Sequence, residues 1–183
     1  KSKENIILFA SRLLVSKGII EFYKSAFELK SKGYKFIIAG KIDNKNPDGI
    51  KLKEILDWQN NGIIQYLGDI KNIESLLNRS AIVVLPSYYG EGLPKILIEA
   101  AACGKPVITT DHPGCRDAII DKRTGLLIPV KDSRVLTKSI EKLMESESLR
   151  DSMGKEARNF AKQNFDINNV IKKHMKIYKD LTY

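Results

Sequence analysis

Two glutamates, Glu91 and Glu99, lie eight residues apart in the segment Gly-Glu-Gly-Leu-Pro-Lys-Ile-Leu-Ile-Glu-Ala, residues 90–100. Pro94 suits the first position of a helix and Gly104 suits its C-terminal stop, so Glu99 falls about five residues into an otherwise apolar helix. Burying a lone carboxylate is costly, so Glu99 needs a partner. At a rise of ~1.5 Å per residue, roughly 7 to 8 Å separate the helix start from Glu99, which is comparable to a diphosphate. One ligand could therefore contact both glutamates.

Two cations follow the first apolar segment of the chain. Arg12 and Lys17 lie between residues 5–10 and the next predicted helix, where free backbone N–H groups also converge. Arginine can bind phosphate oxygens with two hydrogen bonds, lysine adds a point charge, and both would stabilise a diphosphate leaving group. The alternative is that both residues are ordinary surface cations.

Short apolar segments alternate with helical patterns over the first two thirds of the chain. The predicted strands occupy residues 5–10, 35–39, 63–66, 81–85, 106–109 and 126–129. The predicted helices occupy residues 18–32, 50–60, 73–79 and 95–103. Continuous apolar strands between helices indicate an α/β fold, a parallel sheet with helices on both faces. Ligands then bind at the carboxyl ends of the strands.

The last third of the chain is helical and highly charged. An apolar stripe marks one helix, and residues 149–163 and 167–178 form two more; the stripe consists of Leu136, Ile140, Leu143 and Met144. No catalytic motif lies in these helices. We find no internal repeat or linker, so the 183 residues predict one domain.

Composition excludes several classes of protein. The hydrophobic content of 43% is typical of a globular domain, and no apolar segment reaches the ~18 to 20 residues of a membrane helix. The chain starts Lys-Ser-Lys-Glu without a signal or transit sequence, which predicts an excised domain. Cys103 and Cys115 are too few for a disulfide framework, which predicts the cytoplasm. The net charge of +9 favours anionic partners such as nucleotides or lipid head groups, or reflects a lysine-rich solvated surface.

Further motifs accompany the two glutamates. In chain order they are Ala10-Ser11-Arg12-Leu13-Leu14 with Lys17-Gly18, Ile38-Ala39-Gly40, Tyr66-Leu67-Gly68-Asp69, Val84-Leu85-Pro86-Ser87, Gly104-Lys105-Pro106-Val107-Ile108, Gly114-Cys115-Arg116-Asp117 and Thr124-Gly125-Leu126-Leu127. With the E-x7-E spacing of the glutamates, this order resembles the family 4 class of retaining glycosyltransferases, which have two Rossmann-like domains. The whole chain looks like the C-terminal, donor-binding half of such a GT-B fold.

The resemblance implies a nucleotide-sugar-binding domain over residues 1–183, with a C-terminal helix at 164–183 that packs on an N-terminal domain absent from this sequence. The implied activity is transfer of a hexose or N-acetylhexosamine from a nucleoside diphosphate, UDP above all, to a growing or lipid-linked glycan with retention of configuration. This domain alone is expected to be inactive. Segments 88–94, 109–111 and 113–116 look most like the capsule and O-antigen branch of bacterial surface polysaccharide synthesis.

The resemblance also assigns roles to residues. The catalytic residues are Glu91, Arg12 and Lys17, and the donor-binding residues are Arg12, Lys17, Gly40, Ile70, Glu91, Gly92, Leu93, Pro94 and Glu99. Glu91 would contact the transferred sugar or stabilise its anomeric carbon, whereas Glu99 would accept hydrogen bonds from the ribose and Ile70 would contact the base. For Glu99 the alternative is a buried carboxylate paired with a core lysine or tyrosine.

Four other residues near these motifs have weaker interpretations. Tyr66 is expected in the core and not as a stacking platform for the base. Lys41 is expected either near the phosphates or in solvent. His112 is interpreted as a loop residue, because no second histidine lies nearby in the sequence and the resemblance places the catalytically implicated histidine on the N-terminal domain. Asp117 replaces the glutamate usual in the family, which leaves the loop geometry around it open.

The sequence lacks Asp-x-Asp and any Cys/His ligand spacing, so we expect no metal and no cofactor. The expected partners are the nucleotide-sugar donor and a glycan or lipid-linked acceptor bound through the N-terminal domain, with peripheral contact to the inner face of the cytoplasmic membrane and no nucleic acid. Two rival functions stay open. They are a nucleotide-sugar 2-epimerase and a non-catalytic nucleotide-sugar-binding module.

Overall fold

The computed structural model describes residues 4–90 and 92–181 of the chain. Within these residues, parallel strands form one six-stranded sheet with the order β3-β2-β1-β4-β5-β6. The strands are β1 (Ile6–Ala10), β2 (Lys35–Ala39), β3 (Gln65–Tyr66), β4 (Ile82–Leu85), β5 (Val107–Thr110) and β6 (Gly125–Ile128). The order reverses between β1 and β4, so the loops that follow these strands diverge and leave room for a ligand.

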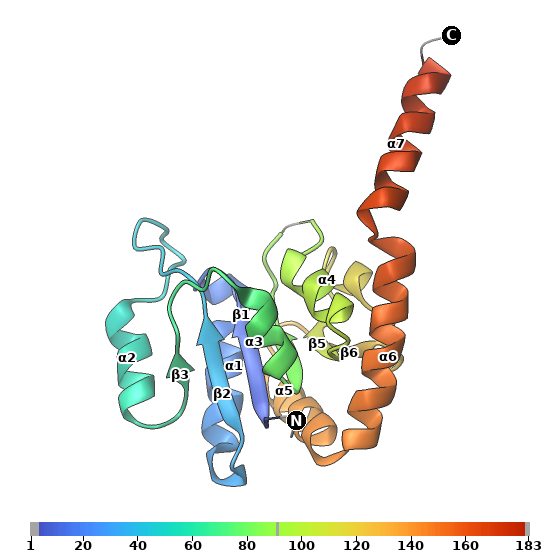
Figure 1. The fold of residues 1–183 in the computed structure, drawn as a ribbon. Coiled ribbons are helices and arrows are strands. Elements are labelled where there is room, and N and C mark those ends of the chain that lie inside the picture. Colours follow the sequence, from blue (N-terminus) through green and yellow to red (C-terminus); the bar gives the residue numbers. More distant parts are fainter. Residues whose placement is uncertain (1–3, 91, 182–183) are drawn as a thin grey trace.

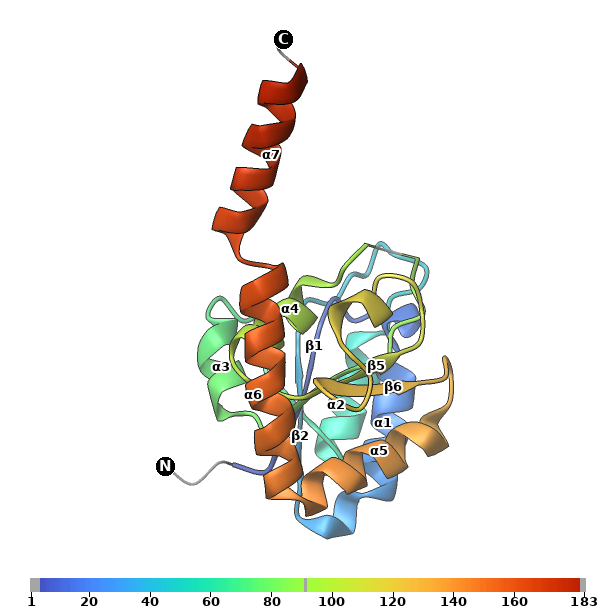
Figure 2. The same ribbon diagram turned by 90° about the vertical axis from the view of Figure 1, so that its right-hand side faces the viewer.

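Helices cover both faces of the sheet (Figures 1 and 2). The α-helices are α1 (Ile19–Glu28), α2 (Leu52–Asn60), α3 (Ile73–Arg79), α4 (Lys95–Ala102), α5 (Ser133–Glu145), α6 (Glu147–Asn164) and α7 (Ile167–Leu181). The described residues also form three short 3-10 helices, η1 (Val15–Lys17), η2 (Lys30–Lys32) and η3 (Arg116–Ala118). Helices α1, α2 and α5 lie on one face, and α3, α4 and α6 lie on the other (Figure 2). This division follows from right-handed crossovers that run in opposite directions from the centre of the sheet.

The core lies at the middle strands of the sheet. Every residue of β1 and β4 is buried, as two-sided coverage by helices requires. On the α1 face, the ring of Phe22 packs 5.4 Å from Phe9 and 5.6 Å from Phe36, centroid to centroid. Full burial of one such side chain stabilises the fold by about 1.5–3 kcal/mol, so these rings hold α1 firmly against β1 and β2.

The predicted fold class is confirmed, and the predicted elements differ from the observed ones mainly at their ends. The single helix expected over residues 18–32 was wrong in extent, because α1 ends at Glu28 and η2 follows before Gly33. The strand expected over residues 63–66 contains only Gln65 and Tyr66. Pro94 precedes the first residue of α4 as its N-cap, with φ −64° and ψ 121°.

Helix α7 extends away from the rest of the molecule (Figures 1 and 2). None of its described side chains is buried. Its large apolar residues are nevertheless spaced to share one face, namely Ile167, Val170, Ile171, Met175, Ile177, Tyr178 and Leu181. No helix among the described residues is both long enough and apolar enough to cross a membrane.

Candidate functional site

A cavity of about 370 Å³ opens at the carboxyl ends of β1 and β2, next to the point where the strand order reverses. Its volume falls in the ~300–1,000 Å³ range of small-molecule sites. The cavity is lined by Ala10, Ser11, Arg12, Ala39, Gly40, Lys41, Asp69, Ile70, Lys71, Ile73, Lys95, Ile96 and Glu99. The loops after the first three strands and the first turns of α4 therefore build one site.

Backbone contacts hold the three loops of this site together. The amide of Ser11 donates to the carbonyl of Ala39 at 3.1 Å, and the amide of Gly40 donates to the carbonyl of Gly68 at 2.7 Å. The phenol of Tyr66 donates to the carbonyl of Gly40 at 3.0 Å. Gly40 has a φ of 148°, and a Cβ there would lie 1.7 Å from the Ser11 carbonyl oxygen. Only glycine allows this close approach.

The side chain of Tyr66 packs against the core, as expected, and also supports the wall of the cavity. Burial raises the pKa of its phenol, and the nearby carboxylate of Asp69 raises it further. The hydroxyl therefore stays protonated at neutral pH and can donate its hydrogen bond to the Gly40 carbonyl.

Glu99 lies on the cavity wall and is only partly shielded from solvent. Its side chain is 30% exposed, and its Oε1 lies 3.2 Å from Nζ of Lys95, which is 87% exposed. A pair of this kind one helical turn apart contributes little to stability. The alternative of a buried carboxylate paired with a core lysine or tyrosine was therefore wrong. The carboxylate is available to a ligand in the cavity.

The two predicted phosphate-binding cations occupy different environments. Arg12 is exposed and lines the cavity. Lys17 ends η1 and is buried, with Nζ 4.8 Å from the ring centroid of Tyr89, and it does not line this cavity. Lys17 is thus shielded from solvent, whereas Arg12 is open to it.

The loop between β4 and α4 contains two tyrosines that each contact a lysine. Nζ of Lys131 lies 4.7 Å from the ring centroid of Tyr88, just as Lys17 lies over Tyr89. The amide of Tyr88 donates to the carbonyl of Ser16 at 2.8 Å, so this loop is anchored to η1. Burial raises the pKa of Tyr88, and the carboxylates of Glu21 and Asp48 add to this shift.

Four predicted donor-binding residues come from this same loop. Glu91 lies outside the described residues. Gly92 is exposed, Leu93 is half-buried and Pro94 is buried. None of these three lines the cavity, although the helix that Pro94 caps does so through Lys95, Ile96 and Glu99.

The structure thus brings together Arg12, Gly40, Ile70 and Glu99, which the sequence predicted as separate parts of one site. Sequence reasoning missed Asp69, Lys71, Ile73, Lys95 and Ile96. Asp69 and Lys71 flank Ile70 in its loop, and Lys95 precedes Glu99 by one turn. Their closeness in sequence to predicted site residues could have identified them. Lys41, left open between phosphates and solvent, lines the cavity and is exposed.

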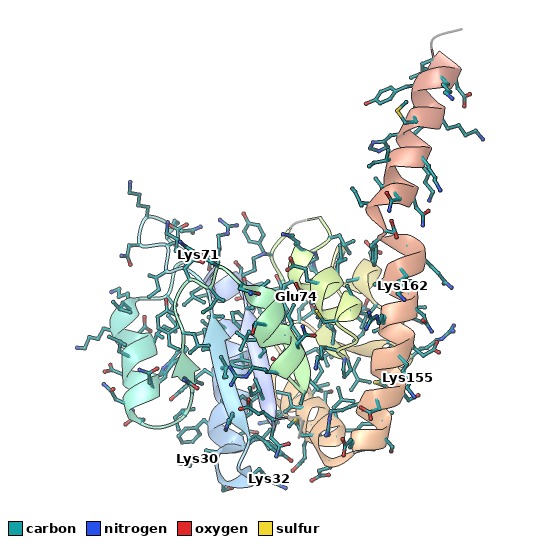
Figure 3. All side chains as sticks on the ribbon, viewed as in Figure 1. Lys30, Lys32, Lys71, Glu74, Lys155 and Lys162 are labelled. Atoms are coloured by element: carbon teal, nitrogen blue, oxygen red, sulfur yellow. The ribbon has the colours of Figure 1, made fainter. Side chains whose placement is uncertain are left out.

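The cavity has more positive than negative side chains. Arg12, Lys41, Lys71 and Lys95 line it against two carboxylates, Asp69 and Glu99. Figure 3 shows Lys71 at the loop end of the molecule, whereas Lys30 and Lys32 lie at the opposite end. The lysines are therefore spread over the whole surface, but those at the cavity can attract an anionic ligand.

Other candidate reactive groups are poorly placed for chemistry. Burial raises the pKa of the Cys103 thiol, with a further contribution from Glu74, and this makes the thiol a weak nucleophile. Nδ1 of His112 lies 3.1 Å from the neighbouring Pro113 carbonyl, and His112 does not line the cavity. Within residues 4–90 and 92–181, no three His, Cys, Asp or Glu side chains gather as metal ligands do.

The strand order and the cavity at the carboxyl ends define a Rossmann-like α/β domain. The chain belongs to the family described as glycosyl transferases group 1, whose model matches residues 1–160. The family and GT-B fold predicted from the sequence are thereby confirmed.

Two relatives and one solved structure illustrate this membership. The chain is 37% identical over 176 residues to the N,N'-diacetylbacillosaminyl-diphospho-undecaprenol alpha-1,3-N-acetylgalactosaminyltransferase of Campylobacter jejuni, covering 96% of this chain and 45% of that protein. It is 30% identical over 162 residues to the capsular polysaccharide biosynthesis glycosyltransferase CapM of Staphylococcus aureus, covering 87% of this chain and 42% of that protein. The crystal structure of Anabaena HepE in complex with UDP has a TM-score of 0.87 and 20% identity, covering 98% of this chain and 50% of that one. This chain thus spans about half the length of the proteins that it matches.

Proposed function

We propose that this chain is the donor-binding domain of a retaining glycosyltransferase and that it binds a nucleoside diphosphate sugar, with UDP as the nucleotide. The observation that carries the proposal is the cavity shared by Arg12, Gly40, Ile70 and Glu99 at the carboxyl ends of the strands. Family membership and the fold shared with a UDP-bound structure support the same ligand.

The lining residues suggest how the donor lies. Ile70 and Ile73 offer an apolar surface to the base, and Glu99 offers an acceptor to the two ribose hydroxyls. Arg12 and the N-terminus of α4 favour the diphosphate, because a guanidinium and free backbone N–H groups both attract anions. The loop of Gly92, Leu93 and Pro94 would then face the distal phosphate and the sugar.

In this arrangement, catalysis depends on stabilising the departing diphosphate. Arg12 and Lys17 would offset the charge that grows on the leaving group, and Glu91 would stabilise the electron-poor anomeric carbon. We propose that the acceptor attacks the face that the leaving group departs from, which retains configuration without a covalent nucleophile. We also propose that cations of the protein replace a divalent metal.

The acceptor side is proposed to come from an additional domain, because the matched proteins are about twice as long. We propose that the apolar face of α7 packs on that domain. The name of the Campylobacter relative describes N-acetylgalactosaminyl transfer to a diphospho-undecaprenol-linked sugar. By analogy, we propose that the full protein acts in bacterial surface polysaccharide synthesis. Its acceptor would be lipid-linked and would be reached from the cytoplasmic face of the membrane.

Calorimetric titration of this chain with UDP, GDP and ADP, with and without EDTA, tests the proposal. We expect UDP to bind most tightly, to bind equally with the chelator present, and to lose affinity about ten- to a hundredfold in Lys17→Ala, since a charge-assisted hydrogen bond is lost. Uridine should bind Lys17→Ala and the parent chain alike. Absence of binding by all three nucleotides at millimolar concentration would refute the donor site, and recovery by magnesium after EDTA would refute the metal-free mechanism.

A further inference from the structure

The loop between β2 and α2 has an internal structure that presents one carboxylate. The side chain of Asn46 accepts a hydrogen bond from the amide of Asp48 at 3.0 Å, and the amide of Gly49 donates to the Asn46 carbonyl at 2.9 Å. A Cβ at Gly49 would lie 2.3 Å from the carbonyl oxygen of Asp43. Asn, Asp and Gly at these positions form self-bonded turns, so the loop holds Asp48 in a defined place.

Asp48 accepts three hydrogen bonds from η1, two from backbone amides and one from a hydroxyl. Its carbonyl accepts from the amide of Val15 at 2.8 Å, and its Oδ2 accepts from the amide of Ser16 at 3.0 Å. The same Oδ2 accepts a short hydrogen bond from the hydroxyl of Ser16. Nearby, the amide of Ile50 donates to the carbonyl of Leu13 at 3.0 Å, so the loop and η1 are joined along several residues.

The residue held by Asp48 directly precedes Lys17. The carbonyl of Ser16 also accepts from the amide of Tyr88, so η1 is clamped between the Asp48 loop and the loop that leads to Glu91. Gly18 completes the constraint, because a Cβ there would lie 2.2 Å from the carbonyl oxygen of Pro86. The backbone at Lys17 is thus held on both sides, and its side chain is buried with Nζ 4.8 Å from the ring centroid of Tyr89.

We propose that Asp48 is a positioning residue for diphosphate binding, acting by holding η1 so that Lys17 is set in place before the ligand arrives. The proposal rests on the proposed function, in which Lys17 binds the diphosphate. Asp48 does not touch the ligand in this assignment. Its Oδ2 instead accepts two hydrogen bonds from Ser16, which tie the carboxylate to η1.

Substitutions at the clamp test the proposal by titration with UDP and with uridine. In Asp48→Ala we expect UDP affinity to fall about tenfold and uridine affinity to change less than about twofold, since only the phosphate-binding cation is released. Asp48→Asn keeps an oxygen that can accept from the Ser16 amide, so it should restore part of the loss. Ser16→Ala should produce a smaller loss with the same selectivity for UDP.

The matched control is Asp43→Asn, because Asp43 lies in the same loop but its side chain accepts from the amide of Lys45 within that loop, at 3.3 Å. It should leave both affinities unchanged. Suppose that Lys17→Ala weakens UDP selectively. The positioning role of Asp48 would then be overturned if Asp48→Ala weakened UDP and uridine equally, or weakened neither. Should Lys17→Ala also leave UDP binding intact, the proposed diphosphate role of Lys17 falls, and the role of Asp48 falls with it. If Asp48→Ala fails to fold, Asp48→Asn and Ser16→Ala decide the question.

Discussion

Glu99 illustrates how one carboxylate can be kept for a ligand. It lies in an apolar helix, yet its side chain faces the cavity and its neighbour Lys95 is almost fully exposed. The ion pair between them adds little to folding, so the fold does not depend on the charge. Glu99 lines a cavity and contributes little to folding stability. Evolution can therefore select its identity for ligand binding.

Substitution of the two glutamates of the motif should affect ligand binding in different ways. We expect Glu99→Gln to weaken UDP and uridine alike, about tenfold, because the ribose belongs to both and an amide replaces an acceptor-only carboxylate. Glu91→Gln should leave UDP affinity nearly unchanged and weaken the UDP-sugar. Titrations with uridine, UDP and a UDP-sugar, with thermal melts of both variants, measure this. Identical profiles, or unfolding of Glu99→Gln, would contradict the assignment.

Glu4 gives a pH-dependent contribution at the start of the sheet. Its carboxylate accepts hydrogen bonds from Lys35 at 3.1 Å and from Arg79 at 2.9 Å, and these partners lower its pKa below the ordinary value of 4.5. A lowered folded-state pKa stabilises the protein above the ordinary value, and the effect disappears as the pH falls through the lowered pKa. Glu4→Gln should therefore reduce the melting temperature slightly at neutral pH and not at strongly acid pH. Melts across this range, with the solvent-exposed Glu28→Gln as control, test the difference.

At the scale of elements, the site depends on how closely three loops approach each other. Gly40 lies between the Ser11 carbonyl and Gly68, and Tyr66 supports it from the core. Each loop follows a different strand. The register of the parallel strands therefore sets how far each loop extends beyond the carboxyl end of the sheet. Changes in this packing should affect stability and binding together.

Alanine at Gly40 should be far more harmful than alanine at another glycine with positive φ. Gly40→Ala would place a Cβ against backbone and should destabilise the fold by more than about 2 kcal/mol. Gly33 has a φ of 73°, and a Cβ there would meet no atom of the described residues within 4 Å, so Gly33→Ala should cost only about 1–2 kcal/mol. Urea denaturation of both variants gives the comparison. Equal losses would mean that the loops after β1 and β2 can separate without penalty.

Local patterns predicted these elements well because apolar segments and glycine stops act over a few residues. Helix α3 was predicted with its observed ends, and α2 began two residues later than expected because the Lys51 amide bonds the Glu54 side chain, capping the helix. Four residues that line the cavity, Arg12, Gly40, Ile70 and Glu99, could be named from their motifs. The role of Tyr66 and the clamp by Asp48 could not, because both act on residues more than twenty positions away in the sequence.

At the scale of the whole molecule, α7 is set apart because it buries none of its described side chains. Its described side chains are exposed throughout, and α6 ends at Asn164 before it begins. An isolated amphipathic helix of this length is marginal in water, so its order depends on what its apolar face meets.

Removing α7 should not affect the rest of the domain. We expect a chain ending at Asp166 to melt at the same temperature and to bind UDP with the same affinity as the full chain, since α7 buries none of its described side chains. Circular dichroism melts and calorimetry measure both quantities. A large loss of stability would show that α7 folds back onto the body in solution.

The strand order also determines when this domain can fold. Strands β1 and β4, both buried along their whole length, are neighbours that pair Ile7 with Ile82 and Leu8 with Val83, although most of the first half of the chain separates them. Until β4 leaves the ribosome, β1 has an unpaired apolar edge and α1 has only part of the surface that it covers. Pairing between strands that are far apart in the sequence slows folding and exposes an aggregation-prone intermediate. Synthesis of this protein therefore has a vulnerable interval that lasts at least until Leu85 has emerged.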